Sequence, residues 1–218
     1  MKRLIAAIAL IAPLYAHAGS WFQFEAGSGA AYGQTLNDGV WYQQGAAQNS
    51  LHAHSPAYLV GATGELARSD AVDLRYHIDY VYFGSQRASC QCVSDDDYNP
   101  HVHQVVKPNA ATSAFAGSGH VQGIAATLDA GYNYGAWRFG AEAGPWIFWE
   151  TWHEQAAPTG DWIDVSHKTV PQLSWVAGAS ITHGALTLSY RYYELPQRWN
   201  PYPALLRAAH VVTFVYRY

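Results

Sequence analysis

The sequence is short of charge, of cysteine and of long apolar runs. Charged residues make up 13% of the 218 residues, and there are only 2 cysteines. The formal net charge is −4, so no basic excess is available to bind the phosphates of nucleic acid. After residue 18 no apolar run approaches the roughly 20 residues that a membrane-spanning helix needs. We therefore expect neither a nucleic-acid-binding protein nor a helical membrane protein.

The first 18 residues have the layout of a secretory signal peptide. Lys2 and Arg3 form a basic start, and an apolar segment follows from Leu4 to Tyr15. Ala16-His17-Ala18 then places small residues at the two positions that matter for cleavage. The apolar segment is too short for a transmembrane anchor. We expect export and cleavage after Ala18, which leaves residues 19–218 as one domain without an internal repeat.

Aromatic residues are abundant, with 9 Trp, 16 Tyr and 7 Phe. Aromatic content combined with alternating apolarity is typical of a membrane β-barrel, although soluble β-sandwiches share much of it. The segment 72–82 decides between them. One face carries Val72, Leu74, Tyr76, Ile78, Tyr80 and Tyr82, and the other carries Asp73, Arg75, His77, Asp79 and Val81. This alternation lasts about eleven residues, which suits a tilted strand that crosses a bilayer, whereas strands of globular domains commonly have about five or six.

The same period of two predicts eight strands along the chain. They lie near residues 21–33, 57–65, 72–82, 121–133, 137–149, 172–182, 186–193 and 210–218. The links near 67–70, 133–136 and 183–185 are short, whereas those near 34–54, 85–119, 152–168 and 195–205 are long. Short periplasmic turns that alternate with long extracellular loops are expected of outer-membrane barrels. The predicted fold class is all-β, an eight-stranded antiparallel transmembrane up-and-down β-barrel.

The last strand carries a family resemblance. Phe214, Tyr216 and Tyr218 alternate with smaller or polar residues, and the chain stops on an aromatic residue. This pattern resembles the assembly signal of bacterial outer-membrane barrels. With the leader at the other end, the mature chain resembles the small barrels of the OmpA, OmpX and opacity-protein type. The resemblance implies a bacterial outer-membrane location and contact with the outer-membrane assembly machinery, lipid and lipopolysaccharide.

The charged residues of the strands fall on the face opposite the aromatic residues. An arginine on the lipid side of the bilayer midplane costs about 2–4 kcal/mol, so these residues must point into the barrel. The expected lumen network comprises Glu25, Asp73, Arg75, His77, Asp79, Asp129, Arg138, Glu142 and Arg191, with Glu65 and Arg217 on the same face. Small residues such as Gly140 and Gly178 share it. The network is expected either to plug the lumen with paired charges or to line a narrow gated pore.

The long segment near 85–119 holds the two cysteines. Cys90-Gln91-Cys92 precedes His101-Val102-His103, and two thiols with two imidazoles would suit tetrahedral zinc. The C-x-C and H-x-H spacings are tighter than those of zinc fingers, so a Cys90–Cys92 disulfide in an oxidising compartment is the preferred interpretation. We expect no metal and no cofactor.

The sequence offers little for catalysis. Lipid A deacylases place a histidine and a serine two residues apart on one strand with an acid nearby, and no H-x-S pattern occurs here. His54 and Ser55 are adjacent and would point to opposite faces of a strand. A lipid A-modifying enzyme remains an alternative, as does the gated pore. Aromatic residues in the long segments, such as Trp41 and Trp162, favour instead a non-enzymatic monomer with a structural or adhesin- or receptor-like role toward an unknown extracellular ligand.

Overall fold

The computed structural model describes residues 22–35, 49–52, 54–93, 98–99, 104–105, 112–157, 163–168, 171–196 and 206–218. Eight strands form the barrel: β1 (Gln23–Thr35), β3 (His54–Arg68), β4 (Val72–Val93), β7 (Thr112–Tyr134), β8 (Trp137–Ala157), β10 (Gln172–His183), β11 (Leu186–Glu194) and β12 (Leu206–Arg217). The signal peptide prediction for residues 1–18 lies outside the described residues. The described part of the chain contains no helix with the length and apolarity needed to cross a membrane.

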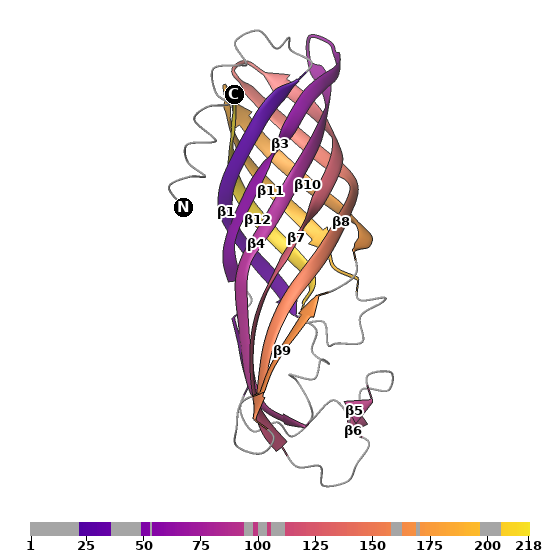
Figure 1. The fold of residues 1–218 in the computed structure, drawn as a ribbon. Helices are drawn as coiled ribbons and strands as arrows, with labels where there is room; N and C mark the ends of the chain where they lie inside the picture. The colour runs from indigo at the N-terminus through magenta and orange to yellow at the C-terminus, as the bar shows by residue number, and fades with distance from the viewer. Residues whose placement is uncertain are drawn as a thin grey trace.

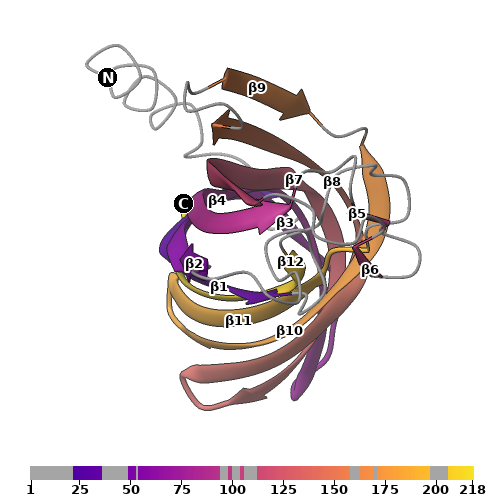
Figure 2. The same cartoon turned by 90° about the horizontal axis from the view of Figure 1, so that it is seen from below.

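The eight strands close into a ring of antiparallel neighbours (Figures 1 and 2). Consecutive strands pair with one another around the ring, and β1 pairs with β12 over a register that joins Glu25 to Arg217 and Tyr32 to His210. Ring closure gives every barrel strand two partners, so no strand edge faces an apolar solvent. The predicted eight-stranded antiparallel up-and-down barrel is confirmed.

Short turns join the strands at one end of the barrel. The β7–β8 and β10–β11 connections are both Gly-Ala pairs, and their glycines have positive φ, 60° at Gly135 and 61° at Gly184. Such backbone angles match the twist of a two-residue hairpin and favour glycine. In the β3–β4 turn, Ser69 donates through its amide and its hydroxyl to the carbonyl oxygen of Val72, at 2.7 and 3.0 Å.

The outer surface of the barrel is apolar. Ile78 of β4 and Ile124 of β7 are 52% and 49% exposed. Large apolar and aromatic side chains are exposed on every barrel strand, among them Tyr32, Val60, Tyr132, Phe139, Trp175, Leu188 and Phe214. Together these exposed side chains form an apolar belt around the barrel. Exposure of so much apolar surface to water would be costly in free energy. The belt is therefore suited to contact with lipid, as the predicted outward faces require.

At the end opposite the short turns, one side of the barrel continues as an open sheet, which we call the projecting sheet (Figure 1). Beyond Phe83 and Val121, β4 and β7 stay paired as far as Val93 and Thr112. The strands β2 (Asn49–His52) and β9 (Ile163–Lys168) pair with the outer parts of β4 and β8. A short hairpin of β5 (Tyr98–Asn99) and β6 (Gln104–Val105) forms a separate sheet.

This extension corrects the predicted loop bounds. The segments near 34–54, 85–119 and 152–168 were expected to be loops, but strands occupy parts of all three. The alternation that marks strands inside a bilayer comes from lipid on one face and a packed lumen on the other. Outside the belt neither constraint acts, and backbone pairing between neighbouring strands is enough to hold the sheet.

Candidate functional site

The barrel interior contains two layers of buried side chains. The layer near the short turns is charged, and the layer near the projecting sheet is apolar and aromatic. Both layers come from the inward-facing parity of the strands, since successive residues of a strand point to opposite faces. The predicted lumen residues are all buried except Arg75 and Glu65, which are partly exposed at the turn end.

Arg191 of β11 is the centre of the charged layer. Its Nε and Nη2 donate to Oε1 and Oε2 of Glu142 at 2.7 and 2.9 Å, and its Nη1 donates to Oδ2 of Asp79 at 2.7 Å. Thr127 Oγ1 donates to Glu142 Oε2 at 2.9 Å. This two-point geometry is the strongest form of ion pairing between arginine and a carboxylate, and it links β4, β8 and β11 across the lumen.

Arg138 of β8 forms a second cluster nearer the short turns. Its Nε donates to Asp73 Oδ1 and its Nη1 to Asp129 Oδ2, both at 2.7 Å. Asp73 also accepts from Asn133 Nδ2 at 3.3 Å and from Arg75 Nη2 at 3.4 Å. A buried charge is tolerated only when it is paired and hydrogen-bonded, and this cluster satisfies the requirement.

His77 of β4 joins the Arg138 cluster to Glu25 of β1. Its Nδ1 lies 2.6 Å from Glu25 Oε1, and its Nε2 lies 3.4 Å from Asp129 Oδ2. Arg217 of β12 donates from Nε to the other carboxylate oxygen of Glu25 at 3.4 Å. The predicted network is therefore brought together in one charged layer, as an Arg191 set and a neighbouring Arg138 set that His77 extends to Glu25 and Arg217.

A cavity of about 10 Å³ lies among these side chains. Glu25, His77, Asp129, Ser180, Arg191 and Arg217 are among the residues that line it. Such a volume accommodates about one water molecule. Within the described part of the chain, three atoms of these lining residues have no hydrogen-bond partner, namely His77 Nε2, Asp129 Oδ1 and Ser180 Oγ.

Glu25, His77 and Asp79 also offer donor atoms within 4.8 Å of one another. However, guanidinium groups already hold both carboxylates: Arg217 contacts Glu25, and Arg191 contacts Asp79. Two adjacent positive charges oppose a metal cation. This grouping therefore belongs to the ion-pair network and does not suit a metal ion.

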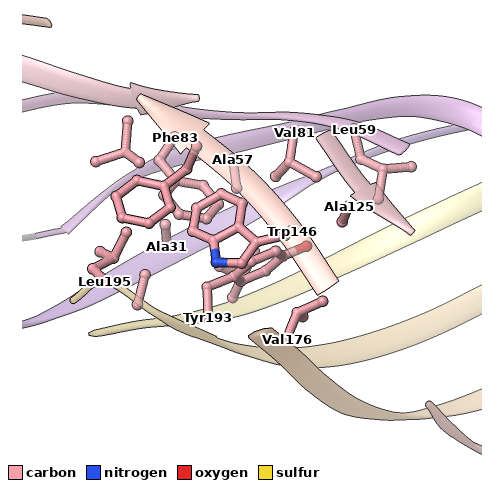
Figure 3. Close-up of a cluster of buried hydrophobic side chains, with 14 of the residues drawn as sticks. Ala31, Ala57, Leu59, Val81, Phe83, Ala125, Trp146, Val176, Tyr193 and Leu195 are labelled. Carbon is pink, nitrogen blue, oxygen red and sulfur yellow. The ribbon is translucent and has the colours of Figure 1, made fainter. Parts of the chain in front are cut away.

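The apolar layer lies between Arg191 and the projecting sheet, and Figure 3 shows part of it, with Phe83, Trp146 and Tyr193 close together. Trp146 is 1% exposed and stacks on Phe148 with ring centroids 4.7 Å apart. Tyr193 packs edge-on against Trp146 at 4.8 Å and against Phe83 at 5.2 Å. Trp146 Nε1 donates to the carbonyl oxygen of Glu194 at 3.0 Å, which satisfies its one polar group. These four rings form an aromatic plug across β4, β8 and β11.

The aromatic plug was not among the predicted site residues. Trp146 lies four residues after Glu142, Phe83 lies four after Asp79, and Tyr193 lies two after Arg191. Each therefore shares the inward parity of a predicted lumen charge. That shared parity was the available signal, but an interpretation that assigns aromatic residues to the lipid face overlooks it.

The remaining predicted residues lie elsewhere. The backbones of Cys90 and Cys92 belong to the projecting part of β4, opposite Phe115 and Ser113 of β7. Their side chains, and all of His101 and His103, lie outside what the structure describes, so the disulfide and the zinc alternative stay predictions. Trp41 and Trp162 are likewise outside the described residues.

The predicted assembly signal lies on the outer surface of the last strand. Phe214, Tyr216 and Tyr218 are all exposed, and the rings of Tyr216 and Tyr218 meet edge-on at 4.9 Å. They therefore belong to the apolar belt at the turn end of the barrel. A role in assembly stays a prediction.

No family model matches this chain, and no curated protein matches it in sequence. Nine chains among the solved structures match it. One is the crystal structure of Ail, the attachment invasion locus protein of Yersinia pestis. That match covers 92% of this chain and 100% of Ail, with 9% sequence identity and a TM-score of 0.41. At this identity and TM-score, the likeness assigns no function and no residue role to this chain.

Proposed function

We propose that this protein is a monomeric, non-enzymatic barrel of the bacterial outer membrane that presents an open β-sheet to a partner outside the cell. The partner would contribute an extended peptide segment, which pairs with an edge of that sheet. The proposal includes export through a cleaved signal peptide and insertion by the outer-membrane assembly machinery. It also includes contact of the apolar belt with lipid and lipopolysaccharide.

The projecting sheet is the observation that carries the proposal. Inside the belt each barrel strand has two neighbours, but at the end opposite the short turns the ring opens into a sheet of β2, β4, β7, β8 and β9. In the described part of the chain, β9 pairs only with β8 and β2 only with β4. Unpaired strand edges are templates for an added strand, and main-chain hydrogen bonds provide the affinity in such complexes.

The packing of the interior supports an anchoring role over transport. Between the projecting sheet and the short turns, the aromatic plug and the arginine clusters fill the described lumen. An ion path would have to break both layers, and breaking a buried charge pair is costly. The described geometry therefore favours neither the gated pore nor an internal catalytic site.

The location is tested by fractionation and gel mobility. We expect the protein in the outer-membrane fraction, with a faster band in SDS without boiling than after boiling. A single unshifted band in the soluble periplasmic fraction would contradict the proposal. Mass spectrometry of lipid A from expressing cells, with an expected unchanged acyl pattern, tests the non-enzymatic part.

The binding role is tested with a barrel that lacks the projection. In the variant, residues 87–118 are replaced by Asn-Gly, so that β4 and β7 join directly after the Gln86–Gly119 pair. Residues 153–166 are also replaced by Asn-Gly, so that β8 and β9 join directly after the Trp152–His167 pair and the unpaired edge of β9 is removed as well. A phage library of linear peptides is selected on the full-length barrel in detergent. We expect the enriched peptides to bind the full-length chain and not the shortened one, provided that both show the gel-mobility shift.

Arg87→Ser is the matched control, because Arg87 is exposed in the projecting part of β4. This substitution changes a side chain and keeps the backbone ladder, so recognition of the edge predicts unchanged peptide binding. Equal binding by the shortened barrel, or no enrichment on the full-length chain, would refute the proposed surface.

A further inference from the structure

Between the aromatic plug and the short turns, the buried carboxylates outnumber the arginine side chains that could neutralise them. The described interior holds five carboxylates, namely Glu25, Asp73, Asp79, Asp129 and Glu142, and four guanidinium groups, namely Arg75, Arg138, Arg191 and Arg217. At the rim Glu65 pairs with Arg68 at 3.5 Å, so that pair leaves the count unchanged. With all of these groups ionised and His77 neutral, the interior would carry one uncompensated negative charge.

An uncompensated charge is costly in this setting. Lipid would surround the belt on the outside, and the side chains described above fill the lumen. Charges in a medium of low dielectric constant must be paired, or the group changes its protonation state. One additional bound proton would make the interior neutral.

Among the buried groups, His77 gives that proton the best surroundings. Glu25 Oε1 faces its Nδ1 at 2.6 Å, and Asp129 Oδ2 faces its Nε2 at 3.4 Å. His77 and Asp129 both line the cavity, and Asp129 Oδ1 has no hydrogen-bond partner among the residues that the structure describes. A ring with both nitrogens protonated therefore has a carboxylate on each side.

Asp79 is the competing position, and it is the poorer one. Its Oδ2 accepts from Arg191, and its Oδ1 has no hydrogen-bond partner among the described residues. A proton on Oδ1 would find no acceptor there, and a buried donor without an acceptor is costly. The geometry thus distinguishes the two positions.

We propose that His77 is a proton-binding site of the barrel interior and is an imidazolium at neutral pH. The bound proton cancels the excess negative charge and ties β1, β4 and β7 together through Glu25 and Asp129. The groups that surround His77 are Glu25 on β1, Arg75 and Asp79 on β4, Asp129 on β7, Arg138 and Glu142 on β8, Arg191 on β11 and Arg217 on β12. This site is independent of the proposed binding role of the projecting sheet.

The protonation state is read directly by ¹⁵N NMR of histidine-labelled barrel in detergent micelles. The signals of His77 are assigned by their displacement in Glu25→Gln. We expect two protonated ring nitrogens at pH 7, with loss of a proton only at alkaline pH. A ring with one protonated nitrogen at pH 7 would overturn the proposal, and this measurement needs no variant that removes His77.

A charge-compensation cycle provides the second test. His77→Gln leaves the interior one charge negative and Glu25→Gln leaves it one charge positive, whereas the double variant is neutral. We expect both single variants to lower the urea midpoint of unfolding, and the double variant to have a higher midpoint than either. Losses that simply add in the double variant would overturn the proposal.

Asp79→Asn separates the two candidate positions. If Asp79 held the extra proton, this substitution would leave the charge unchanged and the midpoint close to that of the native chain. Because we place the proton on His77, we expect Asp79→Asn to lower the midpoint. The midpoint of the native chain should also fall at alkaline pH, since deprotonation of His77 removes stability. His77→Gln should not show this additional fall.

Discussion

Glu142 and Arg191 meet across a strand that lies between them. Glu142 belongs to β8 and Arg191 to β11, and both are in register with Gly178 of the intervening β10. A Cβ atom on Gly178 would lie 3.0 Å from Arg191 Cγ and 3.2 Å from Glu142 Oε1. The two side chains therefore join directly over a position that has no side chain of its own.

Removal of one partner from this pair should be costly. In Glu142→Ala, Arg191 would keep only Asp79 as a carboxylate partner, and Thr127 would lose its acceptor. Breaking a buried ion pair from one side typically costs about 3–5 kcal/mol. We expect a loss of this order in the free energy of unfolding, measured by urea titration in detergent.

The paired replacement is the control for that experiment. Glu142→Leu together with Arg191→Met and Asp79→Asn removes the pair and also the carboxylate that would otherwise lose Arg191 as its partner, and it fills part of the space with apolar atoms. Replacing a buried pair with apolar residues is often close to neutral. This triple variant should therefore be more stable than Glu142→Ala. A triple variant that is less stable than Glu142→Ala would show that the broken ion pair does not cause the loss.

A side chain at Gly178 should also disturb the pair. Besides the two contacts above, an added Cβ would lie 2.5 Å from the carbonyl oxygen of Tyr190, which is backbone and cannot swing away. Overpacking of this kind costs about 1–3 kcal/mol. We expect Gly178→Ala to lower the urea midpoint. Ala179→Gly is the matched control on the exposed face of the same strand and should change it much less.

The period-two alternation of the sequence predicted the strands and their faces, because each face of a barrel strand meets a different environment that restricts its residue types. Lipid requires apolar residues outside, and the narrow lumen requires paired charges or packed rings inside. Period-two alternation therefore marks which residues enter the lumen. It does not show which of them meet: Glu142 and Arg191 are 49 residues apart, and their contact depends on the stagger of three strands around a closed ring.

Two features could not be predicted from the alternation, namely the aromatic plug and the projecting sheet. Trp146 has the parity of the lumen, but its residue type resembles that of the lipid-facing girdle, so type and position gave conflicting signals. In the projection, small and polar residues such as Ser89 and Ser118 replace the alternation. Strand pairing there rests on backbone hydrogen bonds, which leave little trace in composition.

Removal of the largest ring of the plug should destabilise the barrel, while the arginine clusters still block the lumen. Trp146→Ala would leave a space bordered by Phe83, Phe148 and Tyr193, and truncation of a buried tryptophan costs about 3–5 kcal/mol. In planar lipid bilayers we expect the native chain to give no discrete channel openings. Frequent openings of the native chain would show that the plug does not seal the lumen.

The lipid-facing assignment of the belt is tested by placing a charge on it. Ile78 is 52% exposed in the middle of the apolar part of β4, and an arginine on the lipid face near the bilayer midplane costs about 2–4 kcal/mol. We expect Ile78→Arg to lower the free energy of unfolding by this amount in lipid vesicles. Ser85→Arg is the control on the same strand, since Ser85 is exposed beyond the paired belt residues, and it should be tolerated. Equal tolerance of both substitutions would mean that water, not lipid, covers Ile78, because only a hydrocarbon environment penalises the first position more than the second.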